Sequence, residues 1–214
     1  MNMIQKKVLA GIGALGAASM LLAGCGGKDP VESLHDSMEK AVQAEKPFQK
    51  EQKTLEKLEK KEHQLYDSAV KLNMDDYQKI VTLSDQALSN ANQRKKHLKA
   101  EKDSIDDSKQ AFESAKKTSQ EIKDKKVKEK AGHAVALMEK RYASYDLLYK
   151  KYEKAISLDK DLYKLIKDKK LTLAELEEQI SKVNSVYEKV HKQADEFNQF
   201  TKDYNKEKEL LFRK

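Results

Sequence analysis

The C-terminal stretch LAELEEQISKVNSVYEKVHKQADEFNQFTKDYNKEKELL, residues 173–211, decides the fold. Alternating steps of three and four residues along it give ten apolar or aromatic residues in twelve positions: Leu173, Leu176, Ile180, Val183, Tyr187, Val190, Ala194, Phe197, Thr201, Tyr204, Lys208 and Leu211. This spacing places the side chains on one face of a helix and is typical of a coiled-coil seam. The sequence therefore predicts a long helix packed against other helices.

Two short motifs predict corners between long helices. Asn73 is placed to cap a helix with Asp76 at its third position, and Thr172 with Glu175 forms a capping box. Each motif joins two stretches of helical periodicity, so we expect the chain to turn back on itself near residues 73 and 171.

The first helix is expected to start at Asp29 as the N-cap, with Pro30 at the first helical position. Pro47 is expected to kink this helix, because proline cannot donate the bond to the carbonyl four residues before it. A thinner apolar stripe predicts a second helix after the corner at residue 73: Tyr77, Ile80, Ala87, Ala91, Leu98, Ile105, Phe112, Ala115 and Ile122.

The segment over residues 123–132 leaves two topologies open. Seven of the eight residues from Lys123 to Lys130 are charged, Gly132 follows, and the apolar stripe changes phase. A turn here gives four long helices, whereas a continuous helix gives three helices with a very long central one. The coincidence of the phase shift with the glycine favours the turn. In both cases residues 30–214 form an all-α, elongated antiparallel helical bundle or coiled coil.

The N-terminal segment has the features of a lipoprotein signal peptide. Lys6 and Lys7 precede an apolar run over residues 8–22. The run is shorter than the roughly 20 residues that a spanning helix needs. Residues 1–24 are therefore predicted to be removed.

The sequence LAGC at residues 22–25 is a lipobox, which predicts cleavage between Gly24 and Cys25. Cys25 is the only cysteine in the chain and is predicted to carry a diacylglyceryl anchor. Two acyl chains hold a protein stably at a membrane. Residues 25–29 are then a short tether, and the protein is expected at the extracytoplasmic face of the cell membrane.

The composition gives no sign of an enzyme. Of the 214 residues 37% are charged, and there is no tryptophan. No HExxH pair, GxSxG elbow or glycine-rich phosphate loop occurs in the predicted mature chain. No two of the five histidines lie within four residues of each other: His35, His63, His97, His133 and His191. We expect no catalytic residue, no metal site and no cofactor.

Four tyrosines share one helical face and are the first candidate for ligand binding: Tyr142, Tyr145, Tyr149 and Tyr152. With cations beside them, such rings can stack on sugars and pair with anionic groups. The same spacing also fits a bundle seam with hydroxyls at its wet rim. Both interpretations remain open from the sequence.

The second candidate is the basic part of the chain. Residues 94–130 hold 13 basic and 8 acidic side chains, and the candidate contacts are Arg94, Lys95, Lys96, Lys125 and Lys126. Such a surface attracts polyanions, although a solvated face has the same composition. Because the lipobox predicts an extracytoplasmic protein, we expect anionic headgroups or wall polymers as partners and no nucleic acid.

With the LAGC lipobox, the GGK tether at residues 26–28 and a lysine-rich helical body, the chain resembles the YkyA-like family of cell-wall-binding lipoproteins. The resemblance covers essentially the whole mature chain. It implies a Gram-positive-type envelope, a long helical bundle and a wall-binding role, and it brings no catalytic residues. The alternative is a coiled-coil scaffold that pairs with other coiled-coil proteins of an envelope complex.

Overall fold

A computed structural model describes residues 29–213. The predicted signal peptide, the cleavage at Gly24 and Cys25 and the lipidation of Cys25 lie outside the described residues. The elements within them are α1 (Pro30–Ala44), α2 (Lys46–Ala69), the 3₁₀ helix η1 (Met74–Asp76), α3 (Tyr77–Glu121), α4 (Lys125–Ile166) and α5 (Leu173–Phe212). No strand occurs over residues 29–213, so the all-α class is confirmed.

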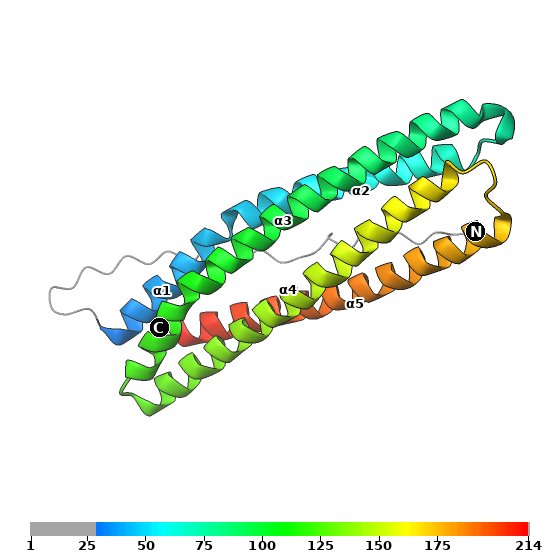
Figure 1. The fold of residues 1–214 in the computed structure, drawn as a ribbon. Coiled ribbons are helices and arrows are strands. Elements are labelled where there is room, and N and C mark those ends of the chain that lie inside the picture. The colour runs from blue at the N-terminus through cyan, green and yellow to red at the C-terminus, as the bar shows by residue number, and fades with distance from the viewer. Residues whose placement is uncertain (1–28, 214) are drawn as a thin grey trace.

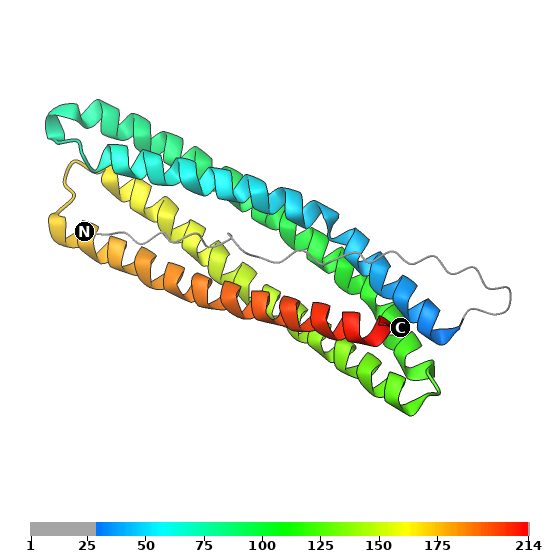
Figure 2. The ribbon, with the colours of Figure 1, turned by 180° about the vertical axis from the view of Figure 1, so that it is seen from behind.

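The helices form an elongated bundle with four columns that alternate in direction (Figures 1 and 2). α1 and α2 follow each other in one column and pack against α3, while α4 packs against α3 and α5. At about 1.5 Å per residue, the 45 residues of α3 are about 67 Å long. The four-helix version of the predicted bundle is therefore the correct one.

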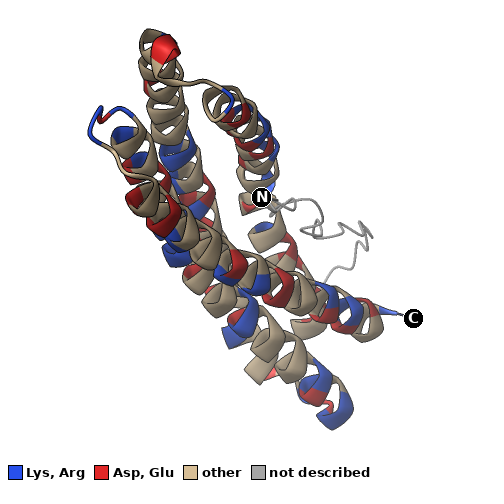
Figure 3. Ribbon diagram, turned by 90° about the vertical axis from the view of Figure 1, so that its right-hand side faces the viewer, with Lys and Arg blue, Asp and Glu red and all other residues tan. Residues whose placement is uncertain are grey.

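The two ends of the bundle differ in the segments they hold (Figure 1). The start of α1, the turn between α3 and α4 and the C-terminus lie at one end, which we call the Pro30 end. The far end holds η1 and the loop between α4 and α5. Lysines dominate this loop, whereas acidic residues mark η1 (Figure 3).

Tyr77 joins the two hairpins at the far end. Its hydroxyl donates a hydrogen bond to the carbonyl oxygen of Lys167 at 2.9 Å, and the ammonium group of Lys169 lies 4.4 Å from the centroid of its ring. The predicted corner caps are present here too: Asn73 accepts from the Asp75 amide at 2.9 Å, and Thr172 and Glu175 form the capping box.

The turn between α3 and α4 lies earlier than the sequence suggested. Ile122 is buried with an extended backbone (φ −64°, ψ 126°), and Asp124 caps α4 by accepting from the Val127 amide at 2.9 Å. Gly132 is exposed inside α4, with open space around it. The predicted break is confirmed, but Gly132 plays no part in it, because a capping aspartate and not the glycine sets the helix start.

The break between α1 and α2 is held by a side chain from α3. Pro47 lies just inside α2, and the hydroxyl of Ser104 lies between the two helix ends. This hydroxyl accepts from the Phe48 amide at 3.2 Å and donates to the Ala44 carbonyl at 2.9 Å. Ser104 therefore bridges a donor and an acceptor that would bond to each other in a continuous helix.

The seam of α5 is buried from Ile180 to Leu211 at all ten predicted positions. Leu173 and Leu176 are exceptions near the helix start: Leu173 has 70% of its surface exposed, and Leu176 is half-buried. Lys208 is buried and pairs with Glu39 of α1. The expected seam is otherwise confirmed, and it is filled within a single chain.

Candidate functional site

The tyrosine face of α4 is part of the core. Tyr142, Tyr145 and Tyr152 are 2%, 1% and 1% exposed, and only Tyr149 is half-buried. Tyr145 packs edge-on against Phe48, with ring centroids 5.7 Å apart. Of the two interpretations, this burial favours the bundle seam: these rings face the other helices because they occupy the seam of α4.

Arg94 is also buried, with 1% of its surface exposed. Its guanidinium binds Glu62 of α2 and Asp159 of α4, the latter at 2.9 Å. It also donates to the hydroxyl of Tyr187 of α5 at 2.5 Å and lies 5.3 Å from the ring centroid of Tyr152. Arg94 is thus a core residue with partners from every column, and its predicted role as a surface ligand contact is corrected.

Carboxyl groups outnumber cations around Arg94. Tyr152 donates to Glu59, and Glu62 and Asp159 bind the guanidinium directly. Burial raises the pKa of Glu62 to about 8, although Arg94 acts in the opposite direction. Burial also raises the pKa of Glu59 and holds that of Glu101 well above its ordinary value. Burial therefore favours the protonated form of these three carboxyl groups.

A second buried ion cluster lies nearer the Pro30 end. Arg141 binds both carboxylate oxygens of Glu45 at 2.7 Å and donates to the hydroxyl of Thr201 at 2.9 Å. The Ser108 hydroxyl donates to Glu45 at 2.8 Å and lies 2.7 Å from the Tyr142 hydroxyl. Glu45 reaches this position because it occupies the break between α1 and α2.

A signal for these clusters is present in the sequence. Steps of three and four residues from Tyr77 through the apolar stripe of α3 also pass through polar positions that the structure buries: Ser84, Arg94, Glu101, Ser108 and Ser119. A polar residue that falls in step with an apolar stripe indicates a buried polar contact. The apolar residues alone give only the helix and its face.

The basic residues over 94–130 do not form one patch. Lys95 and Lys96 are exposed on α3, and Lys125 and Lys126 are exposed at the start of α4. The 26 residues from Lys95 to the end of α3 separate these pairs by about 39 Å. Between them lie lysines engaged with carboxylates, in the pairs Lys99–Asp103, Lys102–Asp106, Lys109–Asp146 and Lys116–Glu139.

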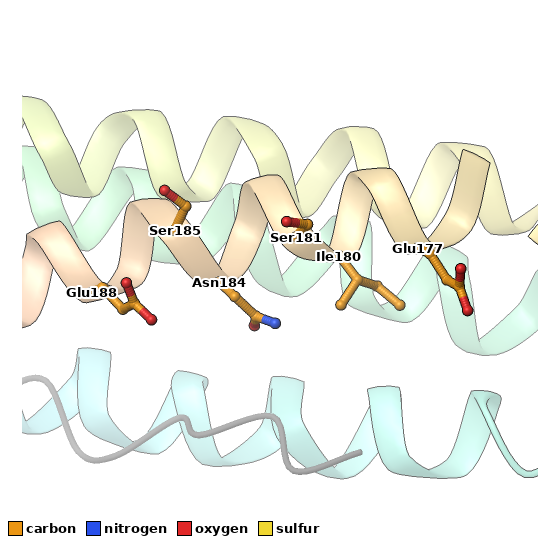
Figure 4. A pocket seen from close by; sticks show the side chains of 6 residues that line it. All are labelled: Glu177, Ile180, Ser181, Asn184, Ser185 and Glu188. Carbon is orange, nitrogen blue, oxygen red and sulfur yellow. The ribbon is translucent and has the colours of Figure 1, made fainter. Parts of the chain in front are cut away.

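One depression of the described surface lies on α5 and has a volume of about 440 Å³. Its lining residues are Glu177, Ile180, Ser181, Asn184, Ser185 and Glu188 (Figure 4). Asn184 and Glu188 point toward α2, and Ser185 points away from it (Figure 4). The depression is open and has a mixed lining, whereas small-molecule sites are typically enclosed and mostly apolar.

Three of the five histidines lie beside one carboxylate each. His97 lies 2.6 Å from Glu51, His63 3.3 Å from Asp67 and His133 3.3 Å from Glu207. Over residues 29–213, no group of three or more His, Cys, Asp or Glu side chains is arranged to hold a metal ion. The described helices also include none that is long and apolar enough to cross a membrane.

The geometry defines a class of elongated all-α bundle with buried ion clusters and a charged exterior. Residues 29–214 match the family described as "Putative cell-wall binding lipoprotein", and the chain belongs to this YkyA family. It is 55% identical over 201 residues to the "Uncharacterized lipoprotein YkyA" of Bacillus subtilis (strain 168), covering 94% of this chain and 90% of that protein.

A solved structure shares the fold. It is the 1.6 Å crystal structure of a conserved protein of unknown function from Staphylococcus aureus, with a TM-score of 0.74 and 18% sequence identity. The match covers 85% of this chain and 91% of that chain. At this identity the likeness concerns the fold alone.

Proposed function

We propose that this chain is an extracytoplasmic lipoprotein, anchored to the cell membrane by lipid on Cys25, whose helical bundle binds the cell wall without enzymatic activity. The observation that carries this proposal is the match of residues 29–214, which span the bundle, to a family described as wall-binding lipoproteins. The LAGC box at residues 22–25 supports the anchor.

The position of the first helix supports an arrangement at the membrane. α1 begins at Pro30, five residues after Cys25. Five residues span at most about 18 Å, so a lipid on Cys25 would hold the Pro30 end close to the headgroups. The far end would then project by up to the length of the bundle, toward the wall.

This arrangement gives the two pairs of exposed lysines different surroundings. Lys125 and Lys126 lie at the Pro30 end, near the proposed anchor, whereas Lys95 and Lys96 lie farther along the bundle. Lysines near an anionic surface are attracted to it over about a Debye length, roughly 10 Å. We assign Lys95 and Lys96 to the wall-facing surface and Lys125 and Lys126 to the membrane-facing one.

Co-sedimentation of the full lipidated chain, in a neutral detergent, with purified wall sacculi tests this proposal. Sacculi are compared before and after removal of their anionic polymers. Salt-sensitive pelleting that is lost on stripping supports binding through anionic polymers, whereas pelleting that survives stripping supports binding to glycan. A chain that stays in the supernatant at both stages contradicts wall binding.

A further inference from the structure

The charged residues of α2 are separated by face. Its lysines Lys46, Lys50, Lys53, Lys57, Lys60 and Lys61 are all exposed. Successive lysines are three or four residues apart, except for the adjacent Lys60 and Lys61, and all six fall within about 100° of the helix circumference. Every exposed residue from Lys50 to Lys61 is a lysine. We call these six residues the lysine face.

Three carboxylates of α2 are directed away from the lysine face. Glu62 binds Arg94 in the core, Glu59 accepts from Tyr152, and Glu51 lies 2.6 Å from His97. Of the six lysines, Lys60 alone forms an ion pair within the described residues, with Glu56 at 2.9 Å. The other five cations of the lysine face therefore have no neutralising partner in the bundle.

This separation is hidden by a charge count along the sequence. Residues 28–93 hold 10 basic and 13 acidic side chains, and by this measure α2 lies in an acidic part of the chain. On α3 and α5 exposed lysines are interspersed with exposed carboxylates, and some of them pair one turn away, as in Lys99–Asp103 and Lys182–Glu178. The lysine face therefore differs from the mixed surfaces of those helices.

We propose that the lysine face of α2 is a binding site for a linear polyanion, of the class of phosphodiester-linked wall polymers. This inference rests on the proposed wall-binding function and names its ligand. Lys61 lies 15 residues after Lys46, about 22 Å along the helix axis. A row of flexible ammonium groups of this length suits a chain of repeated phosphates, because each group can follow a phosphate as a point charge.

A bilayer fits this surface less well. Helices that lie in a membrane interface insert an apolar face beside their basic residues, whereas Phe48, Leu55 and Leu65 of α2 are buried in the bundle. Lys46 is also 16 residues beyond Pro30, about 24 Å along the column. The lysine face thus presents charged groups without an adjacent apolar surface, and it begins at a distance from the proposed anchor.

The test measures binding of fluorescent poly(glycerol phosphate) to the full lipidated chain in neutral phosphatidylcholine nanodiscs. The variant Lys50→Gln/Lys53→Gln/Lys57→Gln/Lys61→Gln is compared with Lys189→Gln/Lys192→Gln/Lys202→Gln/Lys206→Gln on α5. Both remove four exposed charges, and glutamine keeps helix propensity. We expect the α2 variant to lose at least about 10-fold in affinity and to reduce the salt slope by roughly 3, with the α5 variant within about twofold.

Equal losses in the two variants overturn the proposal, because only net charge then matters. The extent of acetylation at each lysine, measured by mass spectrometry, shows whether the polymer or the lipid surface protects the lysine face. Protection of the lysine face by the polymer supports the proposal, and its protection by phosphatidylglycerol nanodiscs without polymer contradicts it.

Sacculi separate this inference from the proposed function. If the α2 variant pellets with sacculi as well as the unmodified chain does, wall binding stands and the lysine face is not its site. If neither pellets while polymer binding still depends on the lysine face, the polyanion site stands and the wall-binding role fails.

Discussion

Arg141 on α4 holds Glu45 by two hydrogen bonds of 2.7 Å each, across 96 residues of sequence. Both side chains are almost fully buried, at 1% and 4% exposure. We expect Glu45→Gln to lower the free energy of unfolding by about 3–5 kcal/mol, because it leaves a buried guanidinium without a counter-charge. Urea unfolding followed by circular dichroism measures this.

The double variant Glu45→Leu/Arg141→Met is the control for that prediction. It removes both charges and replaces them with apolar groups, so it is expected to recover most of the loss. A double variant that is as unstable as Glu45→Gln would show that packing at the helix break, and not the unpaired charge, sets the cost.

Glu62 makes the stability of the bundle depend on pH. Its pKa is raised from 4.5 to about 8 in the folded chain, so the folded state holds a proton that the unfolded state releases. The stabilisation is fully present below pH 4.5 and is lost as pH rises through about 8. One such group changes the free energy of unfolding by about 1.4 kcal/mol per pH unit within this window.

The comparison with Glu62→Gln isolates this group. The urea concentrations at the unfolding midpoint are measured for both chains between about pH 5 and 8. The histidines and the surface carboxyl groups contribute equally to both chains, so their effect cancels in the difference. We expect the unmodified chain to lose stability relative to Glu62→Gln as pH rises. Parallel pH profiles would show that Glu62 is already ionised in the folded state.

Ser104 offers a local test of the break between α1 and α2. Ser104→Ala leaves the Phe48 amide and the Ala44 carbonyl without the hydroxyl that joins them, which costs about 1–3 kcal/mol. Hydrogen exchange at Phe48 is expected to become faster. Ser114→Ala is the matched control, because its exposed hydroxyl bonds only Ala111 of its own helix, and its effect should stay within about 0.5 kcal/mol.

The seam of α5 predicts the association state. Phe197 and Tyr204 are fully buried by other helices of the same chain, so this seam has no free face to offer a second copy. We expect a single, concentration-independent sedimentation coefficient for the chain in neutral detergent. A coefficient that rises with concentration would favour the scaffold hypothesis and a pairing surface other than this seam.

Much of the fold could be predicted because local rules agree with the packing. The caps at Asp29, Asn73 and Thr172 each form the expected hydrogen bond, and the seam of α5 is buried from Ile180 onward. The sequence places the turn between α3 and α4 too close to Gly132. Asp124, which caps α4, is one of many charged residues in this segment, whereas a glycine is a stronger turn signal.

The candidate site was less accessible to sequence reasoning. Arg94 and Lys95 are neighbours in the chain, yet one is in the core and the other in solvent, because 100° of helix separates them. Tyr152 was considered together with the cations of its own helix, whereas its partners Glu59 and Arg94 come from α2 and α3. Charge counts along a chain average over faces, and only the helical phase of each residue separates them.

The two buried arginines also fix how the columns slide past one another. Arg94 and Arg141 lie at different levels. Arg94 binds side chains from the three other columns, and Arg141 binds Thr201 and Glu45, which also accepts from Ser108 of α3. If one hairpin moved along the other by a single helical turn, about 5.4 Å, Arg94 and Arg141 would each lose an ionic partner on the other hairpin while they remained buried. The bundle therefore behaves as a strut of constant length, whose span is set by polar contacts in its interior.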